Sequence, residues 1–153
     1  MTTDGEQESW WIGPAWVVAG VVSYWLASAY SQLASLVWIV ALGWVGLTRW
    51  RQGRPAFYSG FAFGLGVFAP QLTFFYSIFG VAAAALWSIL AFWTGVFVWL
   101  AASARRRFGP VSGALLAPVL WLGLEYARCE LYPLKFAWCA LGSLFEGAGM
   151  PRV

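Results

Sequence analysis

The sequence predicts an all-α membrane protein with about five transmembrane helices and a short interfacial or re-entrant segment. Hydrophobic residues make up 61% of its 153 residues and charged residues only 10%, whereas a soluble globular domain carries about 25% charged residues. Long apolar runs follow one another, and about 20 apolar residues cross a hydrocarbon core of ~30 Å. Twelve Trp and six Tyr agree with this class, because their amphipathic rings favour the membrane interface. The alternative is a buried helical core, but so short a chain has too little polar surface to cover five such helices.

Five apolar runs lie within a predicted helical domain at residues 10–145, between a polar tail at 1–9 and a C-terminal tail at 146–153. The runs cover residues 10–29, 33–47, 56–76, 78–102 and 111–124. The fifth can reach Ala127 if Glu125 lies at the membrane interface. A further apolar stretch at 131–144 contains Pro133 and Lys135, so it is too short and too interrupted to span and reads as interfacial or re-entrant.

The breaks between the runs also carry structural expectations. Ser31 and Gln32 are the main polar residues between the first two runs, which predicts a tight helical hairpin. Pro70 lies inside the third run and removes a backbone hydrogen bond, so we expect a bend there. Gly109-Pro110 breaks the chain after the fourth run.

Arginine clusters predict the orientation. Arg49, Arg51 and Arg54 follow two runs, and a second cluster, residues 105–107, follows two more. Both clusters then lie on the side of the N-terminus, and the positive-inside rule places that side in the cytoplasm. We therefore expect a multi-pass protein of the bacterial cytoplasmic (inner) membrane, with residues 125–153 at the outer face.

Composition excludes several classes of site. The chain has no His, which removes His-type metal sites and His-based acid–base catalysis. Cys129 and Cys139 make neither a disulfide framework nor a zinc site. No basic stripe occurs outside the membrane-flanking clusters, so we expect no nucleic-acid partner. We also expect no metal and no cofactor.

Glycines at 60, 64 and 66 fall within the third run. In a membrane helix, small residues allow a neighbouring backbone to approach closely, and this is the interpretation we favour. A nucleotide-binding glycine loop is not expected, because no strand precedes these residues.

Glu125 and Arg128 are three residues apart and therefore neighbours on one helical face. Charges near a membrane are costly, so they pair, face a cavity or serve function. Two readings stay open: an interfacial salt bridge that ends the fifth helix, or a polar patch at the mouth of a lipid-facing site. A local catalytic set of Glu125 or Glu130 with Lys135 and Cys139 is disfavoured, because a thiolate nucleophile needs a held base or cation.

Two stretches resemble the N-terminal membrane domain of apolipoprotein N-acyltransferase. Residues 60–68, followed by 74–76, are similar to the family's glycine-rich third helix and its Trp-x-Tyr element, with Phe74 in place of Trp and Tyr76 matching. Residues 116–128 resemble the family's A-P-x-L-W-x-x-x-E-x-x-R signature, and 136–142 echo its F-P-W and downstream Gly. Ala137 stands where the family has Pro, and Arg128 is not followed by Gly. The resemblance covers residues 15–145.

The resemblance implies an acyltransferase that moves an acyl chain from a phospholipid to the N-terminal amine of a lipoprotein. In the family, a nitrilase-like α/β domain after the membrane helices supplies a catalytic Glu-Lys-Cys triad. The chain is expected to end before such a periplasmic domain, so no residue is carried over as catalytic. Whether it acts as an enzyme stays open, and we expect it to be inactive alone.

The sequence therefore predicts a membrane module for lipoprotein N-acylation, truncated or stand-alone. Its partners would be membrane phospholipid, and possibly a lipoprotein substrate or a separately encoded nitrilase-like domain. The alternative is a small non-enzymatic membrane protein that binds lipid or a partner protein. Candidate residues for the lipid or substrate groove are Tyr76, Glu125, Arg128, Tyr132 and Trp138.

Overall fold

The computed structural model describes residues 12–48 and 53–131, and that part of the chain is helical and contains no strand. The all-α class predicted from composition is therefore confirmed for these residues. In chain order the elements are α2 (Ile12–Ala29), the 3-10 helix η1 (Ser31–Leu36), α3 (Val37–Leu47), α4 (Gly53–Gln71), α5 (Phe74–Phe79), α6 (Ala82–Phe108), α7 (Pro110–Tyr126) and the π-helical turn η2 (Ala127–Leu131).

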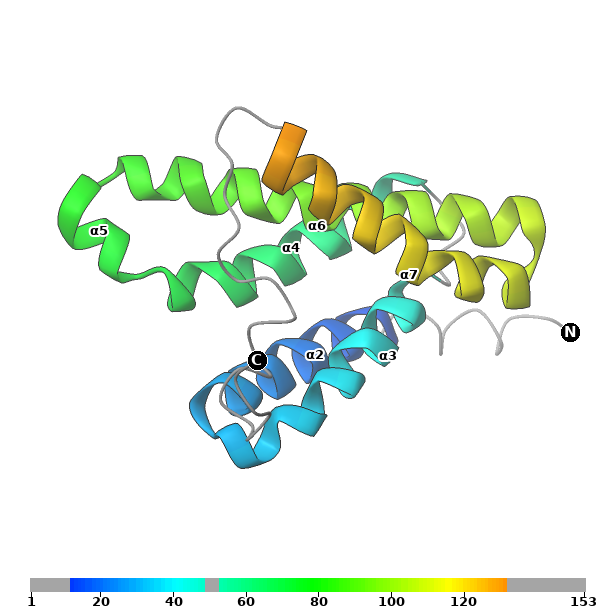
Figure 1. Cartoon of the computed structure of the whole chain (residues 1–153), viewed down its shortest axis with the longest axis horizontal. Helices are drawn as coiled ribbons and strands as arrows, with labels where there is room; N and C mark the ends of the chain where they lie inside the picture. Colours follow the sequence, from blue (N-terminus) through cyan, green and yellow to red (C-terminus); the bar gives the residue numbers. More distant parts are fainter. Residues whose placement is uncertain (1–11, 49–52, 132–153) are drawn as a thin grey trace, which may run out of the picture.

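Helices α2 and α3 form the predicted hairpin, which packs on α4 and, through α3, on α6; it lies below both in Figure 1. The second apolar run, residues 33–47, does not form one α-helix, because its first four residues belong to the 3-10 helix η1. That leaves only 11 residues in α3. The two helices approach closely where a Cβ on Gly46 would lie 2.9 Å from the Trp16 indole.

Helices α4 and α6 make the most extensive contact in the described structure, and glycines allow it. A Cβ on Gly60 would lie 2.9 Å from the carbonyl oxygen of Thr94, and one on Gly64 would lie 2.7 Å from Cα of Ala91. Backbone atoms cannot rotate out of the way, so larger residues would push the helices apart. Gly66 lies on another side of α4, where it faces Val21 of α2. The predicted close approach at glycines 60, 64 and 66 is thus confirmed.

Pro70 lies in the last turn of α4, which ends at Gln71. The predicted continuous run to Tyr76 with a bend is therefore wrong: the helix stops, and residues 72–73 form a turn before the short helix α5. The turn is stabilised by the Thr73 hydroxyl, which donates to the carbonyl oxygens of Pro70 at 2.7 Å and Ala69 at 3.1 Å. A proline near the helix end and a side chain that binds the last carbonyls together favour termination over bending.

Helix α6 is the longest element, with 27 residues, and Arg105, Arg106 and Arg107 lie in its last turn. The predicted break follows it: Gly109 has φ of +89°, and Pro110 is the first residue of α7. Glycine adopts this φ without the steric cost of a Cβ, and proline suits the first turn of a helix.

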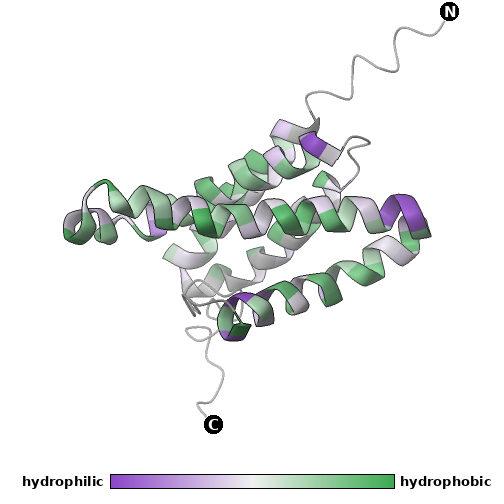
Figure 2. Ribbon diagram, turned by 90° about the horizontal axis from the view of Figure 1, so that it is seen from above, coloured by the Kyte–Doolittle hydropathy of each residue, from purple (hydrophilic) through white to green (hydrophobic). Residues whose placement is uncertain are grey.

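The buried core is small and apolar, and much apolar surface is exposed. Its largest fully buried side chains are Phe63, Leu47, Leu90, Val40 and Val98. Val81, Leu115, Val111 and Trp38 are each about 70–80% exposed, and Figure 2 shows hydrophobic residues along the helices with the most hydrophilic ones at helix ends. An apolar outer surface of this extent is what a lipid environment requires.

Two described helical stretches are long and apolar enough to cross a membrane, Ala82–Phe108 and Pro110–Leu131. The apolar part of α2, Pro14–Ala29, is shorter. The prediction of five transmembrane helices is therefore not confirmed by length and hydropathy. Most of the predicted interfacial segment 131–144 lies outside the described residues.

Candidate functional site

The candidate site is built where α7 packs antiparallel on α6. At the start of α7, Gly113 lies directly against the backbone of Arg105. Farther along, the Phe97 and Trp121 rings meet edge to face, with centroids 5.1 Å apart. One turn later, α7 brings its charged residues beside the middle of α6. The register of the two helices therefore fixes which part of α6 the charges contact.

Glu125 and Arg128 form the predicted pair. The distance from Nη2 of Arg128 to Oε1 of Glu125 is 3.8 Å, and the side chains are 5% and 21% exposed, respectively. Arg128 belongs to η2, where the helix continues through the charged residues as a π-helical turn. π-Helical turns are rare in proteins, and those that occur are often found at functional sites. Glu125 thus lies in the last turn of α7, and Arg128 lies in the π-helical turn that follows it.

A small cavity of about 10 Å³ lies beside this pair. It is lined by Trp93, Thr94, Trp121, Leu124, Glu125 and Arg128. Thr94 is itself buried and lies near the middle of the 27-residue α6. The charged pair therefore packs level with the middle of its neighbour, and not at its end. If α6 spans the bilayer, this position is far deeper than the interfacial one expected from the sequence.

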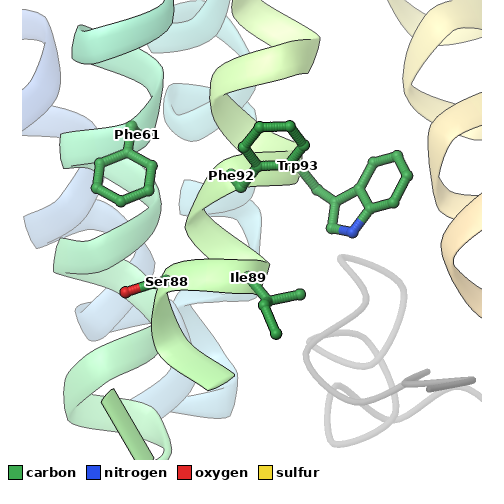
Figure 3. A pocket seen from close by; sticks show the side chains of 5 residues that line it. All are labelled: Phe61, Ser88, Ile89, Phe92 and Trp93. Carbon is green, nitrogen blue, oxygen red and sulfur yellow. The ribbon is translucent and has the colours of Figure 1, made fainter. Parts of the chain in front are cut away.

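A second hollow lies on the other side of Trp93. It is an apolar surface groove of about 350 Å³, lined by Phe61 of α4 and by Ser88, Ile89, Phe92 and Trp93 of α6 (Figure 3). Trp93 thus lines both the groove and the cavity at Glu125 and Arg128. Sequence reasoning missed this groove. The spacing of 88 and 92, and of 89 and 93, marks two helical faces, but the single hydroxyl of Ser88 does not distinguish them from ordinary lipid-facing positions.

Tyr76 does not join the charged pair. It lies on α5, is 56% exposed, and belongs to the far end of the α4–α6 pair, whereas η2 lies over the middle of α6 (Figures 1 and 2). Tyr132 and Trp138 lie outside the described residues. The structure therefore brings together Glu125 and Arg128 and leaves Tyr76 apart.

The members of the disfavoured local triad are only partly described. Cys129 is half-buried in η2 and Glu130 is exposed, while Lys135 and Cys139 lie outside the described residues. Because Lys135 is the only lysine in the sequence, the described residues hold no ammonium group beside Cys129.

The basic residues gather at the opposite end of the α4–α6 pair from α5. Arg54 lies in the first turn of α4, and Arg105–Arg107 occupy the last turn of α6. Gly53 contacts Trp99 near the same end of α6, so both basic groups lie on one side of the antiparallel pair. Arg106 donates a hydrogen bond to the Ser103 hydroxyl at 3.1 Å.

A comparison with known protein families adds the deciding observation: residues 19–147 match the apolipoprotein N-acyltransferase N-terminal domain. The chain belongs to this family. Both stretches that carried the resemblance lie within the matched range, on α4 with α5 and on α7 with η2. No curated protein and no solved structure gives a match. The groove and the charged pair are thus features of an apolipoprotein N-acyltransferase membrane domain.

Proposed function

We propose that this chain is a membrane module that anchors an apolipoprotein N-acyltransferase and shapes its lipid-facing groove. The family match over residues 19–147 is the observation that carries this proposal. The acyltransferase that it anchors would transfer an acyl chain from a phospholipid, through a thioester on a cysteine, to the N-terminal amine of a lipoprotein. In this proposal the catalytic Glu, Lys and Cys belong to a nitrilase-like domain, either later in a longer chain or separately encoded.

The groove between α4 and α6 suits the acyl chain of a phospholipid. Its lining is almost entirely hydrophobic, with Phe61, Ile89 and Phe92 among its residues, and its volume is about 350 Å³. Within a bilayer such contact rests on van der Waals packing of the acyl chain against the groove, because lipid tails are as apolar as the lining. Tyr76, Tyr132 and Trp138 remain candidates for the headgroup end, where rings with one polar edge are favoured.

The proposal includes five membrane passages. The pair η1 and α3 counts as one passage, because six 3-10 residues and 11 α-helical residues extend about 28 Å together. With α2, α4, α6 and the continuous α7–η2, this makes five. The common side of Arg54 and Arg105–Arg107 supports a cytoplasmic N-terminus and an outer C-terminal end in the bacterial inner membrane.

The second candidate is a small non-enzymatic membrane protein that binds lipid or a partner protein. The apolar groove alone supports it, since lipid binding needs no catalytic residues. The neighbouring open reading frame discriminates the two: a frame for a nitrilase-like domain with Glu, Lys and Cys favours a divided acyltransferase.

Reconstitution tests the proposed function directly. The 153-residue chain, a nitrilase-like domain of the family, or both are placed in vesicles with a phospholipid labelled in its acyl chains and a lipopeptide with a free N-terminal amine. We expect labelled amide only with both components, and none with the chain alone. An unrelated helical membrane protein replaces the chain as a control.

Two results would contradict the proposal. One is equal transfer by the nitrilase-like domain with the chain and with the control protein. The other is a thioester that forms on the chain alone and disappears in Cys129→Ala or Cys139→Ala. Retained phospholipid binding without any gain in transfer would favour the non-enzymatic alternative.

A further inference from the structure

Arg128 is buried with part of its hydrogen-bonding capacity unused. Only 4% of the residue is exposed, and in the described structure its Nε and Nη2 atoms have no hydrogen-bond partner. The Oε1 atom of Glu125 is also buried and has no hydrogen-bond partner among the described residues. The 3.8 Å between Nη2 and Oε1 is too long for a hydrogen bond. Leaving such groups unsatisfied in an apolar surrounding costs free energy.

The cavity beside these atoms has the size of one water molecule. Its volume is about 10 Å³, which is about what a single water needs. A phosphate or a lipid headgroup does not fit this volume. The Thr94 hydroxyl is a third polar group in the lining, and the bond that it donates to the carbonyl oxygen of Leu90 is long, at 3.5 Å.

We propose that this cavity is a binding site for one ordered water, which bridges Arg128 and Glu125 within the α6–α7 contact. The water accepts a hydrogen bond from Nη2 of Arg128 and donates one to Oε1 of Glu125. Its second hydrogen points to Oγ1 of Thr94, which accepts while its own hydrogen goes to Leu90. This arrangement gives the water three partners, the number typical of buried waters.

Trp93 is the residue that this cavity and the apolar groove have in common. Figure 3 shows the Trp93 indole directed away from Phe61, toward the side of α7, and the same ring lines the cavity. The water is therefore a fixed part of the helix contact and distinct from the apolar groove. This inference goes beyond the proposed function, because it holds whether or not the chain supports acyl transfer.

The decisive experiment is a structure of the 153-residue chain in lipid nanodiscs, at a resolution that shows ordered water. We expect a water within hydrogen-bond distance of both Arg128 and Glu125. An empty cavity, or a direct bond between the two side chains with no water, would overturn the proposal.

A variant gives a second, independent readout. Thr94→Val keeps the side-chain volume but removes one partner of the water, so we expect the melting temperature in detergent to fall by several degrees. Ser59→Ala is the control, because it removes a partly buried hydroxyl that lines neither hollow and donates to the carbonyl of Ala56 in its own helix, α4. In a dry cavity, the added methyl of valine would leave the melting temperature unchanged or raise it, and that result counts against a bound water.

Discussion

The indole of Trp25 on α2 donates a hydrogen bond of 3.0 Å to the carbonyl oxygen of Gly66 on α4. This carbonyl lies four residues before Pro70, which has no N–H to bind it. Trp25 therefore supplies from another helix the donor that proline removes. In the same α2–α4 contact, Gln71, the residue after Pro70, donates to the Ser28 hydroxyl at 2.6 Å. The end of α4 is thus held by α2.

The Trp25 bond can be measured in a double-mutant cycle. Trp25→Phe should destabilise the protein by about 0.5–1 kcal/mol, the usual net worth of such a bond in water or membrane. In a Pro70→Ala background the cost should shrink, because the new Ala N–H can bind the Gly66 carbonyl within the helix. The measurement is thermal unfolding in detergent. An equal cost of Trp25→Phe in both backgrounds would mean that Pro70 and Trp25 are not coupled.

Alanine should destabilise the protein at Gly64, in the α4–α6 contact, but not at Gly123 on α7. In Gly64→Ala the new Cβ would lie 2.7 Å from Cα of Ala91, so the helices must separate, at a cost of about 1–3 kcal/mol. Gly123→Ala is the matched control in α7, where no atom of the described residues lies within 4 Å of a Cβ. It should be neutral or stabilising by up to about 1 kcal/mol, since alanine favours a helix over glycine. Comparable losses at both positions in thermal unfolding would refute close packing at Gly64.

Features that depend on local sequence could be predicted. The Gly109-Pro110 break follows from the backbone preferences of the two residues, and the Glu125–Arg128 pair from a three-residue spacing. The close approach at Gly60 and Gly64 follows from their missing side chains. Each of these requires only neighbouring residues or one small residue on a helix face.

Features that depend on contacts between distant segments could not be predicted. The end of α4 at Pro70 is held by Trp25 of another helix, 41 residues before Gly66 in the sequence. The depth of the Glu125–Arg128 pair depends on the α6–α7 register, which is set by packing such as that of Gly113 against Arg105. The groove at Phe61 has no polar residue pattern that distinguishes it from other lipid-facing surface.

The orientation can be tested with reporter fusions. Fusions after Arg54 and after Arg107 should report a cytoplasmic location, because both arginine groups lie at one end of the α4–α6 pair and positive residues stay inside. Fusions at Gly80, between α5 and α6, and at Val153 should report the outer side. An outer location for the fusion after Arg107 would be incompatible with this topology.

The charged pair predicts an asymmetry between its two single variants. Glu125→Gln leaves the buried Arg128 uncompensated, and a guanidinium cannot lose its charge, so the cost should approach about 3 kcal/mol, toward the range for broken buried pairs. Arg128→Gln should cost less, because the Glu125 side chain that it leaves without its partner is 21% exposed, against 5% for Arg128. The double variant should be no worse than Glu125→Gln, and the exposed Glu130→Gln serves as the control without effect. Thermal unfolding of the four variants in detergent decides the matter: if the two single losses simply add in the double variant, the residues do not act as a pair.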